Sequence, residues 1–359
     1  MLKASFHSDT SLFYDLLFSE EYQRLLTRPE LLRHEVLAAP QKITHFIIDE
    51  IQRIPALLNE VHWLIENTRG KFFGMSGSSA RKLKRGQANL LAGRAWTYEL
   101  FPLTHKELGS QFSLEKALSL GTLPSVYLCD KREESVLTLQ AYSDTYLKEE
   151  IQAEALVRNL RGFLQFLRLA ADENGHLLNY SSLAREVGTT YQTIKDYFQV
   201  LEDTLLGFFL FPYAESNRTR LVKHPKFYFF DTGIQRMFAK KTPFPLEPKT
   251  AEFGHAFEHF MIAEVRRLAA YQRQDYRFSF FHSAGHAEVD LVVETPQRKV
   301  FAIEMKATER PDSSLKGLKI FQQIRPDAIG LCACLAPHRR QLKDIAIVPW
   351  QDLFEILEL

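Results

Sequence analysis

The chain has 359 residues, 45% hydrophobic and 25% charged, which is an ordinary globular composition at a length that favours two or three domains. Its 45 basic and 44 acidic residues leave a net charge of +1, which excludes an affinity for nucleic acid that rests on overall charge. Three cysteines are too few for a disulfide framework. No apolar stretch approaches the roughly 18 residues that span a bilayer, and the N-terminus lacks a signal peptide's apolar segment. We therefore expect a cytoplasmic protein with no membrane partner.

Two adjacent acids follow a continuous apolar run in the first hundred residues. Residues 11–17 predict a short strand, and helices follow it. Phe46-Ile47-Ile48 is apolar on both faces, as in a central parallel strand, and Asp49 and Glu50 come directly after it. In a P-loop ATPase the first such acid orders Mg²⁺ and the second polarises the attacking water. The alternative is an ordinary surface turn after a core strand.

The next predicted strand ends in small polar residues. A helix opened by Pro55 separates it from the first, and residues 72–75 then run into Ser76 and Ser78. If the two strands are neighbours, one of these hydroxyls lies beside Asp49 and can hydrogen-bond a water or a γ-phosphate. A Ser/Gly turn that caps a helix over residues 80–85 explains the same residues.

Three segments, HFIIDEIQRIP, FGMSGSSARKLKRGQANLLAGRA and ELFPLTHKEL, together resemble the AAA-type ATPases that carry a C-terminal domain of unknown function with a nuclease-like fold. The resemblance implies ATP and Mg²⁺ as cofactors. It makes Asp49 the Mg²⁺-ordering acid, Glu50 the catalytic acid and Ser76 the sensor residue. It also places Arg94 where an arginine contacts phosphate, although Arg94 can instead cap a helix or pair with Glu99.

One part of such an ATPase is missing from the sequence. The phosphate-binding motif G-x-x-x-x-G-K-[ST] occurs nowhere in the 359 residues. The family places this loop upstream of Tyr14, where a strand, the loop and its helix do not fit. We therefore expect a truncated or remnant member, or a true start upstream of Met1, and weak or absent ATP binding by the chain itself.

The middle of the chain has the pattern of a winged helix. Residues 111–157 predict helices with a break at Pro124, and residues 160–171 predict a strongly apolar helix. Residues 179–197 then read as helix, Gly188 turn, helix. Residues 207–212 and 226–230 predict the two strands of the wing. The segments LLNYSSLAREVG, TIKDYFQVLEDT and KHPKFYFFDTGI extend the resemblance to the same family.

A winged helix makes double-stranded DNA a candidate partner. Its second helix enters the major groove, where it would present Gln192 and Lys195. The wing would contact phosphates through Arg218, Arg220 and Lys223. The alternative is a winged-helix fold that serves only as a packing module, because the second helix also carries several acids.

The last third predicts a helix followed by a hairpin with acids on one face. Residues 252–265 form an amphipathic helix pattern, and residues 287–294 and 300–307 alternate as paired strands. Glu304 and Lys306 are two apart, so they share one face. Asp290 comes close to them if the hairpin pairs in register.

This pattern resembles the core of the PD-(D/E)XK nucleases. The resemblance implies that Glu258, Asp290 and Glu304 hold Mg²⁺ and that Lys306 is the catalytic cation. Phosphodiester hydrolysis needs such carboxylates to hold the metal and a cation beside it. The alternatives are the solvated face of an antiparallel sheet, or a nuclease-like fold without nuclease activity.

The sequence thus predicts an α/β multidomain protein. The expected domains are an AAA-type ATPase core with a partial P-loop parallel sheet but no phosphate loop (1–110), a helical region with a winged helix (111–240) and a restriction-endonuclease-like α/β domain (241–359). The expected function is that of an ATPase-family protein with weak or no hydrolysis by itself. A Mg²⁺-dependent DNA nuclease and a non-catalytic DNA- or partner-binding protein are the alternatives. Each is compatible with an oligomer.

Overall fold

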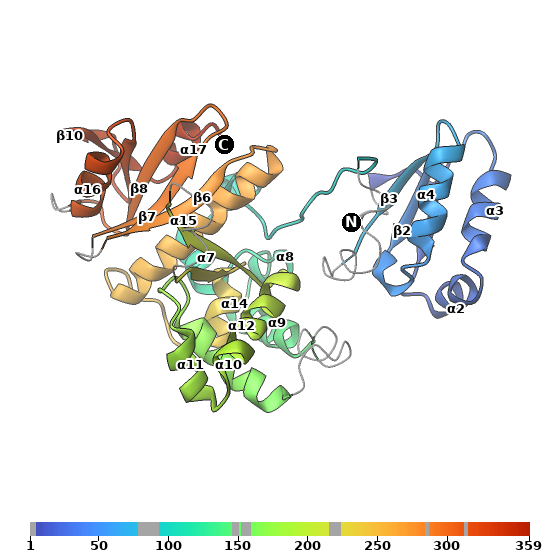
Figure 1. Ribbon diagram of the computed structural model, residues 1–359, viewed down its shortest axis with the longest axis horizontal. Helices are drawn as coiled ribbons and strands as arrows, with labels where there is room; N and C mark the ends of the chain where they lie inside the picture. Colours follow the sequence, from blue (N-terminus) through green and yellow to red (C-terminus); the bar gives the residue numbers. More distant parts are fainter. Residues whose placement is uncertain are drawn as a thin grey trace. The chain divides into compact units, whose positions relative to one another are not determined.

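The computed structural model describes residues 5–77, 93–145, 151, 159–214, 224–283, 287–311 and 315–359 (Figure 1). The chain divides into two compact units, one spanning residues 1–97 with 203–205 and the other spanning residues 98–202 with 206–359. Both combine helices with β-sheet, so the predicted α/β class is confirmed. Within the described ranges, no helix is both long and apolar enough to cross a membrane.

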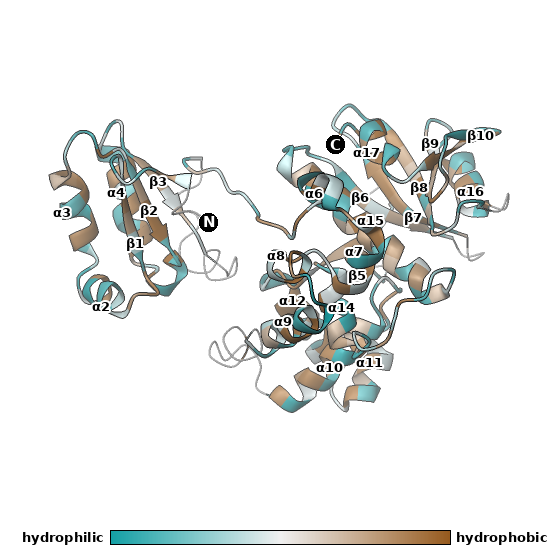
Figure 2. Cartoon of the chain, turned by 180° about the vertical axis from the view of Figure 1, so that it is seen from behind, coloured by the Kyte–Doolittle hydropathy of each residue, from teal (hydrophilic) through white to brown (hydrophobic). Residues whose placement is uncertain are grey.

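The first unit is built on a parallel sheet of three strands in the order β1-β2-β3. The strands are β1 (Ser11–Asp15), β2 (His45–Asp49) and β3 (Phe72–Met75), and the helices are α2 (Ser19–Thr27), α3 (Glu30–Ala38) and α4 (Leu57–Asn67), with a 3-10 turn η1 (Ile51–Arg53). The predicted central strand is confirmed, since Phe46, Ile47 and Ile48 are all buried. Figure 2 shows the hydrophobic colouring of β1 and β2.

Helices dominate the first half of the second unit. In chain order they are α6 (His105–Leu108), the 3-10 turn η3 (Gly109–Gln111), α7 (Leu114–Leu120), α8 (Pro124–Tyr127), α9 (Arg132–Thr145), α10 (Leu160–Asp172), α11 (Tyr180–Val187), α12 (Tyr191–Asp203) and α14 (Thr232–Phe238). The turn between α11 and α12 is confirmed: Gly188 has φ 73° and ψ 40°, a left-handed conformation that glycine adopts without strain. Phe166 of α10 and Phe198 of α12 meet edge to face at 4.8 Å and anchor this helical core.

The second half of this unit contains a mixed sheet of eight strands in the order β10-β11-β9-β8-β7-β6-β4-β5. The strands are β4 (Gly207–Pro212), β5 (Lys226–Phe229), β6 (Arg277–His282), β7 (Glu288–Glu294), β8 (Val300–Lys306), β9 (Ile329–Cys334), β10 (Arg340–Leu342) and β11 (Ile345–Pro349). The predicted hairpin is confirmed, because β7 and β8 pair antiparallel with Leu291 opposite Ile303.

Helices cover the two faces of this sheet. Helix α15 (Ala251–Tyr271) packs on one face, where Met261 and Ile303 belong to the same core, and α17 (Asp352–Ile356) contributes to that core. Helix α16 (Lys316–Ile324) packs on the other face, where Phe321 belongs to the same core as Ala302 and Cys332. Successive residues of a strand point to opposite faces, so this arrangement fixes which side chains of β7 and β8 face which helix.

The two strands predicted as a wing pair with each other and also join the large sheet. Gly207 of β4 lies opposite Phe229 of β5, in antiparallel register. The end of β4 then pairs in parallel with β6, with Phe211 opposite Ser279. The helix pair and the two strands are therefore present. Their assignment as a winged helix stays a prediction, as does the restriction-endonuclease-like assignment of the larger sheet.

Candidate functional site

The C-terminal end of the first sheet brings three predicted site residues together. Strands β2 and β3 are parallel neighbours with Ile48 opposite Met75, so the residues that come next, Asp49 and Ser76, are adjacent. The Ser76 hydroxyl donates a hydrogen bond to the Asp49 carboxylate and accepts one from the backbone N–H of Glu50 at 3.3 Å. All three are half-buried, and ligands bind at this end of open α/β sheets.

Glu50 turns the chain sharply at the end of β2. Its φ of 60° and ψ of 42° lie in the left-handed region, which costs a residue other than glycine roughly 1–2 kcal/mol. The neighbouring backbone holds the turn, because the N–H of Ile51 donates to the Ser76 carbonyl at 3.0 Å. The Gln52 amide also donates to the Glu50 carboxylate. Strain of this kind clusters at functional sites, where the surrounding structure maintains it.

Arg94 lies on the surface of the first unit. Its guanidinium donates to the Glu66 carboxylate, and both side chains are more than two-fifths exposed. A pair this exposed contributes little to stability. Glu99, the alternative partner expected from the sequence, lies 3.6 Å from Arg266 of α15. Ser78, the other candidate hydroxyl, falls outside the described residues.

In the second unit, Asp290 stands where β7 and β8 separate. The two strands pair as far as Leu291 and Ile303. At this point the Asp290 carboxylate accepts a hydrogen bond from the backbone N–H of Met305 at 2.7 Å, in the role that a backbone carbonyl has in a regular strand pair. Glu304 and Lys306 share one face of β8, as predicted, and their charged groups lie 3.2 Å apart. The Lys306 side chain is 42% exposed, so this pair opens to solvent at one end.

Glu258 approaches this region from α15 but has other partners. Its carboxylate accepts from the Tyr228 hydroxyl at 2.7 Å and from the Lys226 ammonium at 3.3 Å. Lys226 also lies 2.5 Å from Glu288 of β7. The sequence analysis did not predict the two partners of Glu258, nor the pairing of Lys226 with Glu288. The available signal was a lysine in an aromatic strand, KFYF, whose charge needs a buried partner once the strand is covered.

Burial and neighbouring charges shift the pKa values of Asp290, Glu258 and Tyr228. Burial raises the pKa of Asp290 to about 7, the negative charge of Glu258 adds to the rise, and Lys306 and Lys226 oppose it. Burial alone would also raise the pKa of Glu258, but Lys226 and the Tyr228 hydroxyl lower it. Burial, followed by the charge of Glu258, holds the pKa of Tyr228 well above its ordinary value. Asp290 is thus the member whose charge changes near neutral pH.

The predicted ligands of a shared divalent ion each have partners within the protein. Across the described part of the chain, no three acidic, histidine or cysteine side chains gather closely enough to hold a metal. Each predicted ligand already has a protein donor: Lys226 and Tyr228 for Glu258, a backbone N–H for Asp290 and Lys306 for Glu304. The oxygen donors suit Mg²⁺ chemically, and their role as ligands stays a prediction.

The predicted DNA-contact residues divide between described and undescribed parts of the chain. Gln192 and Lys195 lie exposed on α12, where Gln192 donates to Asp196 at 2.9 Å. The Lys195 ammonium lies 4.9 Å from the centre of the Tyr191 ring, a cation–π distance. The remaining predicted contacts fall outside the described residues: Arg218, Arg220 and Lys223.

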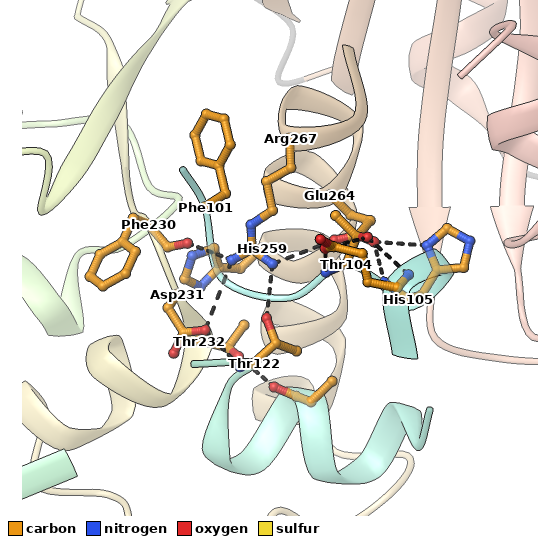
Figure 3. Close-up of polar contacts among 12 residues, drawn as sticks. Phe101, Thr104, His105, Thr122, Phe230, Asp231, Thr232, His259, Glu264 and Arg267 are labelled. Carbon is orange, nitrogen blue, oxygen red and sulfur yellow. Dashed lines mark hydrogen bonds and ion pairs between the residues drawn. The ribbon is translucent and has the colours of Figure 1, made fainter. Parts of the chain in front are cut away.

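A separate polar network lies buried beside α15 (Figure 3). Arg267 donates to the Phe230 carbonyl at 2.6 Å and to the Thr122 hydroxyl at 3.1 Å, and it lies 3.4 Å from Glu264. Its guanidinium is also 3.9 Å from Asp231. Burial raises the pKa of Asp231, and Arg267 opposes that rise. This network joins three separate segments of the chain.

The same network reaches α6 and the turn before α14. The backbone N–H of His105 donates to Glu264 at 2.7 Å, and the imidazole Nδ1 lies 2.8 Å from the same oxygen. Asp231 caps α14 by accepting from the N–H groups of Gly233 and Ile234, and it also accepts from the N–H of Thr122 at 2.8 Å. With every partner internal, this network holds the unit together rather than presenting a reactive group.

Family comparisons divide the chain into three matched regions. Residues 1–109 match the model described as an AAA domain. Residues 111–244 match a domain of unknown function, DUF8612, and residues 253–353 match another, DUF4143.

Three bacterial relatives match the chain, and each is described as an uncharacterized protein. One from Mycobacterium tuberculosis and one from Mycobacterium bovis are each 27% identical over 269 residues, which cover 74% of this chain and 59% of the relative. One from Haemophilus influenzae is 25% identical over 254 residues, which cover 66% of this chain and 61% of the relative. The chain thus spans about three-fifths of the length of these relatives. The chain therefore resembles AAA-domain proteins over residues 1–109 and domains of unknown function over residues 111–244 and 253–353.

Proposed function

We propose that this chain is an ATPase-family protein whose first unit supplies the acidic part of a Mg²⁺–nucleotide site. The observation that supports it is the contact of Ser76 with Asp49, beside Glu50, at the C-terminal end of a parallel sheet. The residues that match the AAA domain include all three. Bound Mg²⁺–ATP would supply the reactive phosphoryl group.

Each residue has a distinct proposed role. Asp49 would hold the ion through its carboxylate, and Ser76 fixes that carboxylate by donating to it. Glu50 would polarise the attacking water, since it is adjacent and its carboxylate is oriented by Gln52. Arg94 would contact phosphate after leaving its weak surface pair with Glu66.

The chain alone is expected to bind ATP weakly. The phosphate loop, which makes most of the contacts to the phosphates, does not occur in the 359 residues. A titration with a fluorescent ATP analogue should therefore give an affinity weaker than micromolar, unchanged in Asp49→Ala. The exposed Asp9→Ala serves as the matched control. Micromolar binding that is lost in Asp49→Ala but kept in Asp9→Ala would contradict this expectation.

A metal-dependent phosphodiesterase in the second unit is the second proposal. The separation of β7 and β8 at Asp290, together with the Glu304–Lys306 pair, supports it. Glu258, Asp290 and Glu304 would hold the ion after moving together, and Lys306 would stabilise the charge that develops on the phosphate. The wing and α12 would supply the DNA contacts.

Nuclease activity is tested with a supercoiled plasmid and Mn²⁺ or Mg²⁺. Cleavage is expected to fall by about a hundredfold or more in Asp290→Asn and in Lys306→Ala, because each removes a charge the reaction needs. Asp344→Asn, an exposed acid of the same unit, should cleave like the wild type. Absence of cleavage in the wild type contradicts the proposal. A salt-sensitive gel shift without cleavage favours the non-catalytic DNA-binding alternative.

A further inference from the structure

Lys226 is the most deeply buried charged group of the acid cluster. It starts β5, and only 3% of its surface is exposed. Its ammonium lies 5.4 Å from the centre of the Phe280 ring, so its surroundings offer little hydration. A lysine is almost never buried this far without paired acids. The partners of its ammonium therefore decide what it does.

Those partners come from two elements other than β5. Glu288 of β7 lies 2.5 Å from the ammonium, and Glu258 of α15 lies 3.3 Å from it. Both distances are those of direct ion pairs, which favour the charged form of the amine. One cation thus bridges two carboxylates, which is the arrangement a divalent ion would otherwise create.

We propose that Lys226 is a positioning residue whose ammonium serves as the built-in cation of this acid cluster and keeps divalent metal ions out of it. The proposal rests on the acids of the proposed phosphodiesterase site, and it adds a condition for metal binding at that site. Metal would enter only when Lys226 withdraws from Glu258.

A simple structural salt bridge is the competing explanation. Such a bridge would also tie β5 to β7 and α15, and its loss would destabilise the unit. A purely structural salt bridge predicts no gain in metal affinity when Lys226 is replaced. If Lys226 fills the cation position, removing its charge must leave carboxylates that recruit a divalent ion. Tyr228 would still orient Glu258 through its hydroxyl.

The test measures Mn²⁺ binding from the electron paramagnetic resonance signal of free Mn²⁺, in the full chain. All variants carry Asp49→Asn, so that the proposed Mg²⁺ ligand of the first unit does not contribute. Lys226→Met is expected to bind Mn²⁺ at least about tenfold more tightly than the Lys226 parent, because a positive charge beside the carboxylates has been removed. Lys226→Arg keeps the charge and should bind as weakly as the parent.

Two further substitutions locate the gained site, and a third guards against misfolding. Adding Glu258→Gln to Lys226→Met should abolish the gain, whereas adding Asp344→Asn, an exposed acid of the same unit, should leave it intact. If Lys226→Met does not fold, Lys226→Gln replaces it, since it keeps a donor for the carboxylates without the charge.

The outcomes separate this inference from the proposed nuclease. A folded charge-free variant that binds Mn²⁺ no more tightly than the parent overturns the inference. So does a parent that binds tightly and loses binding in Lys226→Met. The Mn²⁺ binding measurement contains no nucleic acid, so its result does not depend on whether the chain cleaves plasmid DNA. Gained Mn²⁺ binding without cleavage in any variant supports the inference and counts against the nuclease.

Discussion

Replacing Arg267 by methionine is expected to lower the free energy of unfolding of the second unit by about 3–5 kcal/mol. Its side chain is 4% exposed and faces Glu264, which is fully buried. Methionine fills a similar volume but leaves that carboxylate without its cation and the Phe230 carbonyl without its donor. Removing one partner of a buried charge network costs more than the network contributes when intact, because the remaining charge stays desolvated.

Urea unfolding followed by the fluorescence of Trp350 reports this change. Trp350 is buried in the second unit, and replacing Trp63 and Trp96 by phenylalanine removes the other tryptophan signals. Arg168→Met, at an exposed position of α10, should stay within about 0.5 kcal/mol of the parent. Adding Glu264→Gln to Arg267→Met should recover part of the loss. A loss below about 1 kcal/mol in Arg267→Met would show that these contacts do not stabilise the second unit as the geometry indicates.

Replacing Gly317 by alanine is expected to destabilise the second unit by about 1–3 kcal/mol or more. Gly317 is in the first turn of α16, and a Cβ atom there would meet the Glu288 carbonyl oxygen at 1.6 Å and the Glu304 carboxylate at 3.0 Å. The first contact is with backbone, so the helix has to move away from β7. That movement disturbs the two strands that carry the candidate acids.

Gly254→Ala is the matched control for that substitution. Gly254 also lies in a helix, α15, and a Cβ atom there would meet nothing within 4 Å. Because alanine favours helix, this variant should be neutral or more stable by up to about 1 kcal/mol. Thermal unfolding of both variants gives the comparison. Equal stability of the two would mean that α16 does not pack against Glu288 as closely as described.

Local patterns in the sequence were sufficient for much of the fold. The continuous apolar run at Phe46–Ile48 identifies a strand covered on both faces, and the structure buries it. The position of Ser76 beside Asp49 follows from one assumption, that two successive strands are parallel neighbours. The pairing of β7 with β8 follows from period-2 spacing around a short turn.

Contacts between segments far apart in the sequence could not be predicted from local patterns. Lys226 reads as a wing residue, and only the packing of α15 and β7 around β5 makes it the partner of two acids. Nor does the spacing of Asp290 and Glu304 show that each carboxylate already has a protein donor. Side-chain partners depend on tertiary placement, which neither spacing nor resemblance specifies.

The pairing of β4 with β6 has a consequence for how the chain is made. Phe211 finds its partner Ser279 only 68 positions later (279 − 211). At the usual pace of a ribosome, roughly 5–20 residues per second, that interval lasts roughly 3–14 seconds. Until then β4 has β5 on one side and an unpaired backbone edge on the other. Nascent chains of this protein therefore pass through a stage that exposes a phenylalanine-rich strand edge, which is when a chaperone would be most useful.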